Sequence, residues 1–172
     1  MRHGLPLLAL ALFAGAACSG TAHPPPGAPA SVPPSPLPLT PVVTLDGTST
    51  DLHQVLRGRV GVVSLWATWC EACLGEIDAL ERLQTQALTR DDAVVVGVAV
   101  GETRETVAAF TRQRHLPYAQ LVDETFRLAD ALGEERVPAT LVVDRDGRIV
   151  FRAGALDHAG LAAFRSALGG GP

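Results

Sequence analysis

The stretch Val62–Leu80, VVSLWATWCEACLGEIDAL, holds two cysteines where an apolar run gives way to a helical pattern. The N-terminus of a helix carries partial positive charge and free N–H groups, which favour the reactive thiolate form of Cys70. Cys73 follows one turn later and is close enough to attack a mixed disulfide on Cys70. We therefore predict a reversible Cys70–Cys73 disulfide, with Cys70 as the exposed nucleophile and Cys73 as the less exposed resolving partner.

Two other uses of a CxxC pair are a zinc site and a static disulfide. Zinc normally takes four ligands, and the chain has no second CxxC and no closely spaced Cys/His pair. A disulfide that closes so short a loop stabilises a fold very little. We therefore expect redox chemistry at the cysteines themselves, with no metal and no cofactor.

Residues 1–18 have the features of an export signal. A positive charge at Arg2 precedes the apolar stretch Leu5–Ala17, and small residues lead to Cys18. The stretch is shorter than the roughly 20 residues that a membrane-spanning helix needs. Because the pattern resembles a lipobox, with Gly15 in place of the usual large aliphatic residue, we expect Cys18 to carry a lipid. Simple cleavage near residues 14–16 and an uncleaved membrane anchor are the alternatives.

Residues 19–41 contain nine of the thirteen prolines of the chain. Such a composition cannot build a packed core, so we predict a semi-extended tether here and a folded domain over residues 42–172. A signal, a lipid site and a tether place that domain outside the cytoplasm, in the periplasm or cell envelope, anchored to a membrane. The net charge of −4, without a basic block, argues against nucleic acid as a partner.

From Val60 on, the order of apolar and periodic segments is β-α-β-α-β-α-β-β-α, which predicts an α/β three-layer sandwich with a mixed sheet. The expected strands are Val42–Leu45, Val60–Trp66, Val94–Val100, Tyr118–Val122, Ala139–Val143 and Ile149–Arg152. The expected helices are Leu52–Leu56, Cys70–Ala87, Thr103–His115, Thr125–Leu132 and Asp157–Leu168. Asp146-Gly147 predicts a hairpin between the last two strands.

With the CxxC at the end of the first buried strand, residues 42–170 resemble the thioredoxin fold. They are most similar to the TlpA/ResA-like group of extracytoplasmic thiol–disulfide oxidoreductases. The resemblance rests on Val62–Leu80 and on Arg136–Thr140, RVPAT, followed by LVVDRDGRIVFRAG. The segment Thr103–Leu132 matches the helix–strand insertion of that group. The chain departs from the group at Ala72 and Asp78, where proline is common.

The resemblance implies that the chain reduces disulfides of exported proteins, apocytochrome c being one substrate class. Its partners would be protein thiols and disulfides in the cell envelope and a membrane electron donor, and we expect a monomer. The same chemistry run as a disulfide oxidase or isomerase is one alternative. A binding module without turnover is another. A peroxidase is disfavoured because Ala67 stands where its motif requires threonine.

Glu76 is the candidate acid of the site. It lies three residues after Cys73 on the same helical face. The resemblance implies a buried acid here, whose pKa burial would raise so that it exchanges protons with Cys73. An ordinary solvated glutamate is the alternative. Ser64 occupies the strand position where plain thioredoxins have a buried aspartate, which leaves Glu76 as the acid beneath the site.

Glu71 and Ala72, between the cysteines, are expected to face the substrate. The negative charge of Glu71 would raise the pKa of the Cys70 thiol and make the Cys70–Cys73 dithiol/disulfide couple more reducing. Screening of the Glu71 charge by solvent, with almost no effect on Cys70, is the alternative.

Three further residues complete the expected substrate site. Trp69 is predicted to form part of the docking surface, whereas Trp66 packs beneath the helix start. The resemblance implies a cis peptide bond at Pro138, facing the cysteines and exposing the backbone of Val137 to a substrate segment. A trans proline at the entry of a strand is the more common alternative.

Overall fold

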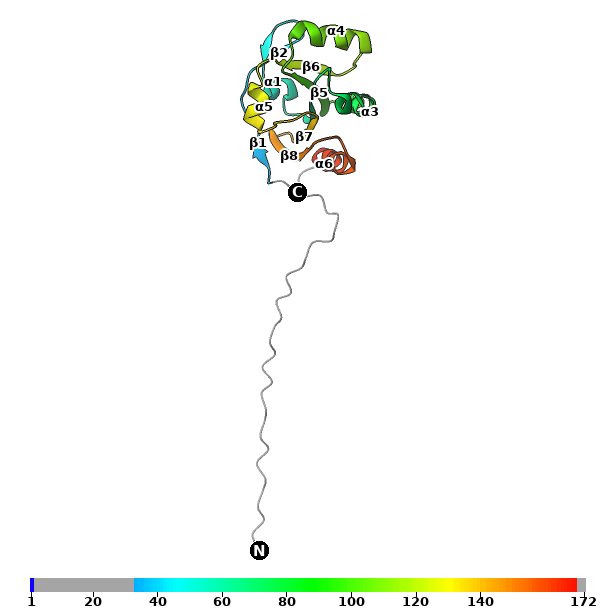
Figure 1. Cartoon of the computed structure of the whole chain (residues 1–172). Helices are drawn as coiled ribbons and strands as arrows, with labels where there is room; N and C mark the ends of the chain where they lie inside the picture. Colours follow the sequence, from blue (N-terminus) through cyan, green and yellow to red (C-terminus); the bar gives the residue numbers. More distant parts are fainter. Residues whose placement is uncertain (2–32, 170–172) are drawn as a thin grey trace.

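The computed structural model describes Met1 and residues 33–169 (Figure 1). The expected signal peptide, the lipid site at Cys18 and the first part of the proline-rich segment lie outside the described residues. Within the described part of the chain, each helix is too short or too polar to cross a membrane.

Eight strands form one mixed sheet in the order β1-β8-β7-β4-β5-β6-β2-β3. They are β1 (Ser35–Pro36), β2 (Val42–Thr44), β3 (Ser49–Thr50), β4 (Val60–Trp66), β5 (Ala93–Val100), β6 (Ala119–Asp123), β7 (Ala139–Val143) and β8 (Arg148–Ala153). The central strands β4, β5 and β6 are parallel and buried, and the flanking strands pair antiparallel. The predicted α/β architecture is confirmed.

Within residues 33–169, six helices pack around the sheet. They are α1 (Leu52–Leu56), α2 (Glu71–Leu74), α3 (Ile77–Ala87), α4 (Arg104–Arg114), α5 (Arg127–Leu132) and α6 (His158–Gly169). Side chains of α1 and α5 share one buried cluster with the sheet, and those of α3 and α6 share another. These two pairs of helices lie on opposite sides of the sheet (Figure 1).

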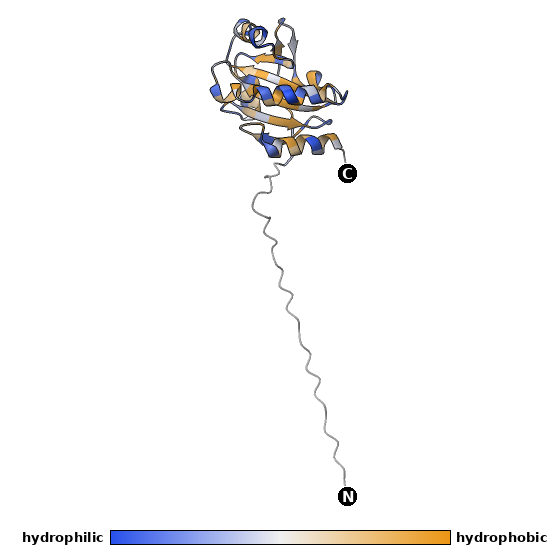
Figure 2. Cartoon of the chain, turned by 90° about the vertical axis from the view of Figure 1, so that its right-hand side faces the viewer, coloured by the Kyte–Doolittle hydropathy of each residue, from blue (hydrophilic) through white to orange (hydrophobic). Residues whose placement is uncertain are grey.

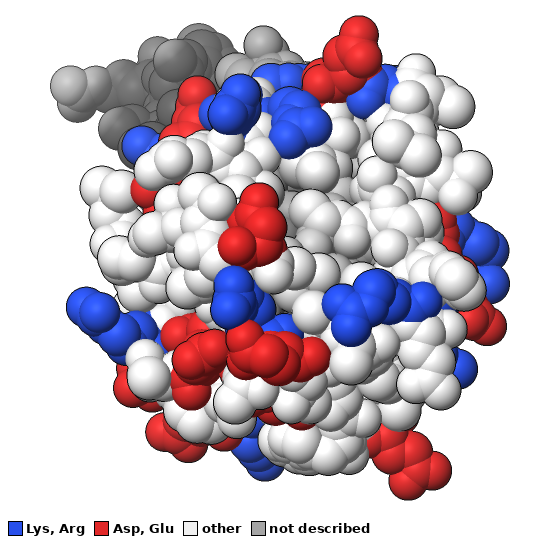
Figure 3. Space-filling model, turned by 90° about the horizontal axis from the view of Figure 1, so that it is seen from above, with Lys and Arg blue, Asp and Glu red and all other residues white. Residues whose placement is uncertain are grey.

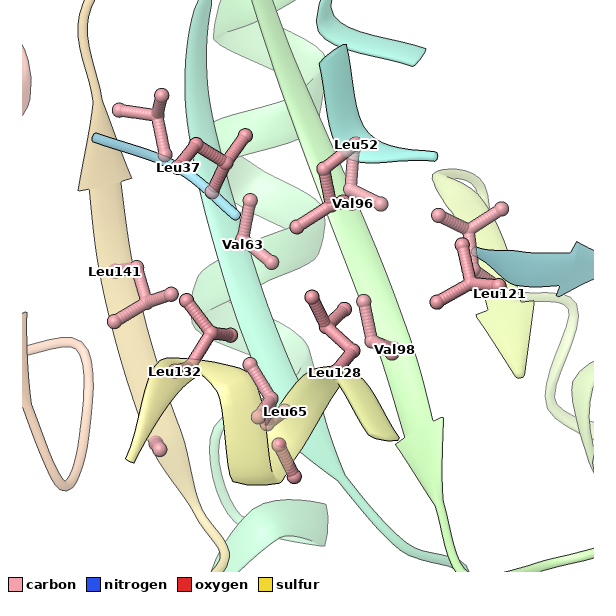
Figure 4. Packing of buried hydrophobic residues seen from close by; sticks show 14 of the residues in the cluster. Leu37, Leu52, Val63, Leu65, Val96, Val98, Leu121, Leu128, Leu132 and Leu141 are labelled. Carbon is pink, nitrogen blue, oxygen red and sulfur yellow. The ribbon is translucent and has the colours of Figure 1, made fainter. Parts of the chain in front are cut away.

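The alternation of side chains along the strands explains this division. Val63 and Leu65 of β4 face α1 and α5, whereas Val60 and Val62 face α3 and α6. Figure 4 shows Leu128 of α5 lying over these strands. The strands are largely apolar between helices whose outer faces are polar (Figure 2).

Charged side chains contribute little to holding these layers together. On the face drawn in Figure 3, acidic and basic groups are interspersed. Exposed ion pairs such as Arg104–Glu105, 2.8 Å apart, are screened by solvent. Burial of the apolar faces is therefore the main source of stability.

The single helix expected over residues 70–87 is wrong in one respect, because the structure divides it into α2 and α3. At Gly75-Glu76 the backbone turns more tightly, and the Glu76 N–H bonds to the Cys73 carbonyl only three residues back. Glycine favours such a break. The result is a separate four-residue helix that contains Cys73 and has Cys70 as its N-cap residue.

The expected start of the domain at Val42 is also corrected. Residues 35–37 belong to the fold, because β1 pairs with the beginning of β8 and Leu37 is buried in the core. The backbone of Leu37 bonds to Gly147, and its carbonyl lies 2.9 Å from the His53 ring. Composition alone missed this segment because Pro36, which lacks an N–H, is tolerated at a sheet edge.

Candidate active site

Cys70 and Cys73 form a disulfide at the start of α2. Cys70 is the N-cap residue, and its Sγ accepts a hydrogen bond from the Cys73 N–H at 3.2 Å. That N–H is therefore placed to stabilise a Cys70 thiolate after reduction. The expectation that Cys70 is exposed is wrong for the oxidised chain. Only 6% of Cys70 is accessible, against 3% of Cys73, because both pack with Trp66 and Ala67.

Trp66 packs beneath the start of α2, in one buried cluster with Cys70 and Cys73, as expected. Its indole N–H donates a hydrogen bond to the Gln120 side chain at 3.1 Å, and its ring packs on Phe110. Gln120 reaches this position because Gly97, on the neighbouring strand, has no side chain. A Cβ at Gly97 would collide with the Gln120 amide. The sequence contains no local signal for this contact, which joins residues 54 positions apart.

Glu102 is a residue of the site that sequence reasoning missed. Its carboxylate accepts two hydrogen bonds from Thr68, one from the backbone N–H at 2.7 Å and one from the hydroxyl at 2.5 Å. Thr68 lies two residues before Cys70, so Glu102 fixes the turn that leads to Cys70. The signal available was its place directly after β5, since adjacent parallel strands end at the same edge of the sheet.

The Val137–Pro138 peptide bond is cis, as the resemblance implied. Val137 and Trp69 line the same cavity, so the structure brings these two predicted substrate-binding residues together. Trp69 is 68% exposed, in keeping with a docking role. Glu71 and Ala72 are also exposed on α2. The binding of substrate by all five residues stays a prediction.

Glu76 is half-buried rather than solvated. One carboxylate oxygen accepts a hydrogen bond from the Leu156 N–H in the β8–α6 loop, and the other is buried without a hydrogen-bond partner. Burial raises the pKa of Glu76, and the bond from Leu156 opposes this rise. The side chain thus engages the β8–α6 loop, and none of the hydrogen bonds within residues 33–169 joins it to either cysteine.

Tyr118 is a buried residue whose pKa is influenced by Glu76. Burial raises its pKa to about 12, and the negative charges of Glu81 and Glu76 contribute to the rise. Tyr118 therefore remains a neutral phenol at physiological pH.

Glu76 is predicted to make the stability of the oxidised chain depend on pH. Its folded pKa is raised, so its stabilising contribution is complete below the unfolded pKa of about 4.3 and is lost as the pH rises through the folded value. Glu76→Gln cannot ionise. We expect its free energy of unfolding to exceed that of the wild type at about pH 8, and the difference to shrink towards about pH 4.

Urea denaturation across this pH range checks the prediction, with Asp78→Asn, an exposed acid of α3, as the matched control. A pH-independent difference between Glu76→Gln and the wild type would show that the Glu76 carboxylate pays no desolvation cost in the fold.

Among residues 33–169 the acidic, histidine and cysteine side chains form no group of three or more that could hold a metal ion.

A CxxC disulfide at a helix start, beside a cis-proline and at the edge of a mixed sheet, defines a thioredoxin-like protein. The family model described as Redoxin matches residues 28–162. The chain belongs to the Redoxin family.

One curated relative and two solved structures are similar to this chain. The thiol-disulfide oxidoreductase ResA of Halalkalibacterium halodurans is 26% identical over 106 residues, which are 62% of this chain and 59% of that protein. This chain therefore spans about three fifths of that relative. The resemblance to the TlpA/ResA-like group is confirmed.

The first solved structure is a thioredoxin-family thiol:disulfide interchange protein from Chlorobium tepidum. It is 26% identical, with a TM-score of 0.66 over 81% of this chain and 100% of that one. The second is the exposed lipoprotein thioredoxin Etrx1 of Streptococcus pneumoniae. It is 20% identical, with a TM-score of 0.63 over 74% of this chain and 98% of that one. The thioredoxin-like fold is confirmed.

Proposed function

We propose that this chain is an extracytoplasmic thiol–disulfide oxidoreductase that reduces disulfides of exported proteins. The observation that carries the proposal is the Cys70–Cys73 disulfide at the N-terminus of α2, next to the exposed Trp69 and the cis peptide bond at Pro138. A reactive sulfur, an apolar contact and an open backbone segment at one place are what exchange with a polypeptide disulfide requires.

The reaction begins with the reduced chain. The Cys70 thiolate attacks one sulfur of the substrate disulfide, the substrate S–S bond breaks, and the departing substrate thiolate takes up a proton. Cys73 then loses its proton and attacks Cys70 Sγ, which forms the Cys70–Cys73 bond and releases the second substrate thiol. Two electrons pass from the chain to the substrate, and a membrane dithiol donor returns them to the chain.

In this proposal Glu76 accepts the proton that Cys73 loses in the second step. A half-buried carboxyl group with a raised pKa accepts a proton more readily than a solvated one. Glu76→Gln is then expected to resolve mixed disulfides roughly a hundredfold more slowly, the loss that general acid–base catalysis typically represents.

The place of action follows from the N-terminal sequence. The signal-like residues 1–18 and Cys18 favour export and lipid anchoring, and Etrx1 is an exposed lipoprotein with the same fold. The substrates are protein disulfides in the cell envelope, and apocytochrome c is the class that the resemblance suggests. Disulfides are scarce in the cytosol, which supports an oxidising compartment for this chemistry.

The direction of electron flow is tested by the reduction potential of the full chain, equilibrated with glutathione or dithiothreitol. We expect a value at or below about −250 mV, in the range of thioredoxin, partly because Glu71 disfavours the Cys70 thiolate. A value near about −120 mV would reverse the direction and make the chain a disulfide donor.

A further inference from the structure

A cavity of about 290 Å³, which we call the aromatic pocket, is lined by Trp69, the residue before Cys70, and by Val137, the residue before Pro138. Its lining includes the buried side chains of Leu65, Val100 and Ala129 and the accessible side chains of Trp69, Phe126 and Val137. The lining is thus largely apolar. Trp69 precedes Cys70 and Val137 precedes Pro138, so the pocket is continuous with the proposed exchange site.

Phe126 has an unusual backbone. Its φ of 60° lies in the left-handed region, which a bulky side chain rarely adopts. The ring lies against the backbone of Gly101, where an added Cβ would approach Phe126 Cζ to 2.1 Å. Glycine at 101 is therefore required for this placement of the ring. Such strain persists where the surrounding structure imposes it, and it is often associated with function.

Asp123 holds the segment that carries Phe126. Phe126 is the N-cap of α5 but makes no capping bond with its own side chain. The buried Asp123 carboxylate accepts the N–H groups of Leu128 and Ala129 instead, at 2.9 and 3.0 Å. The start of α5 is thereby fixed, and the Phe126 ring stays 48% exposed at the pocket. An aromatic ring held open to solvent in this way is available to a partner side chain.

The charges at the pocket argue for an apolar occupant. Glu134 is paired with Arg152 at 3.0 Å, and Glu135 and Arg136 contribute opposite charges. The pocket therefore offers no net charge to attract a charged side chain. The polypeptide segment that passes it is the one whose cysteine reacts with Cys70, since Trp69 of the lining directly precedes Cys70 and Val137 packs against the cluster that contains Cys70.

We propose that the aromatic pocket binds a large apolar side chain near the reacting cysteine of the substrate, and that Phe126 determines this specificity. The proposal rests on the proposed function and names its substrate class: polypeptide disulfides with an aromatic or large aliphatic residue within a few positions of the cysteine. Segments with glycine or an acidic residue at that place are poorer substrates.

Matched peptides test the proposal. Each carries one cysteine in a mixed disulfide with 2-nitro-5-thiobenzoate, and the peptides differ only in placing Phe, Leu, Gly or Asp at successive positions around it. The reduced full chain attacks the peptide sulfur and releases the coloured thiolate. We expect the Phe and Leu peptides at the best position to react roughly tenfold faster than the Gly and Asp peptides.

Two variants of Phe126 locate the source of the preference. Phe126→Ala removes the ring, and Phe126→Asn also removes it while tolerating the left-handed backbone, so that at least one folded variant is available. We expect the tenfold preference to fall within about twofold in both. Leu88→Ala removes a comparably exposed apolar side chain from the end of α3 and is expected to keep the full preference.

The outcomes separate the two proposals. Equal rates for all peptides would overturn the pocket and leave the oxidoreductase intact. A preference that survives both Phe126 variants would also overturn it. No reaction with any peptide would overturn the proposed function and the pocket together. A wild type that elutes as a dimer, with Phe126→Asn a monomer, would mean that a second copy of the chain occupies the pocket.

Discussion

Replacement of Cys70 with serine is expected to reduce disulfide exchange to the uncatalysed background. Serine has no accessible anion at neutral pH to replace the thiolate. Cys73→Ser is expected to give a different result, because Cys70 still attacks but the mixed disulfide is not resolved. Mass spectrometry of the non-reduced reaction would show a stable adduct of the Cys73 variant with one substrate chain, and no adduct of the Cys70 variant.

The double serine variant distinguishes catalysis from binding. If the chain acts as a binding module that uses the surface around Trp69 and Pro138, the double variant would still restore the phenotype of a deletion strain. We expect no restoration. An adduct that forms through Cys73 in the Cys70 variant would exchange the roles assigned to the two cysteines.

Removal of the Glu102 carboxylate is expected to impair both stability and reactivity. Glu102→Ala loses two hydrogen bonds from Thr68 to a charged group, each worth about 1.5–3 kcal/mol when well formed. The turn before Cys70 is then free to shift, and a displacement on the order of 1 Å can slow a reaction up to a hundredfold. Urea denaturation and the rate of Cys70 alkylation in the reduced chain measure the two effects.

Glu102→Gln is the matched control, because the amide keeps an acceptor for the Thr68 N–H and offers a donor to the hydroxyl. We expect it to stay close to the wild type in both measurements. If Glu102→Ala is destabilised but keeps the wild-type pH profile of alkylation, Glu102 is a structural residue and does not position the nucleophile.

Sequence patterns predicted the elements whose cause is local. The apolar run Val60–Trp66 is β4 with the expected bounds, and Ala139–Val143 is β7. The helix at Leu52–Leu56 begins at a capping aspartate, Asp51, and is also confirmed. Such elements follow from apolar periodicity and capping residues, both of which can be read from a single sequence.

The remaining features depend on contacts between distant parts of the chain. The pairing of β1 with β8 joins Ser35 to Ile149, and the bonds between Glu102 and Thr68 join two strand ends. Neither of these contacts produces a periodic pattern in the sequence. The burial of Cys70 depends likewise on how Trp66 and Ala67 pack around the formed disulfide. These contacts decide how Cys70 is held, and the CxxC motif alone does not reveal them.

The short strand β1 has a consequence for how the chain meets other polypeptides. The open edge of a sheet offers unpaired backbone groups to any extended chain, and an enzyme that handles unfolded segments meets many of them. Here β1 covers the beginning of β8, and Pro36, opposite Arg148, has no N–H to donate. The opposite edge ends in β3, which is only two residues long. Each outermost strand is only two residues long, so neither provides the long, regular ladder on which chains aggregate.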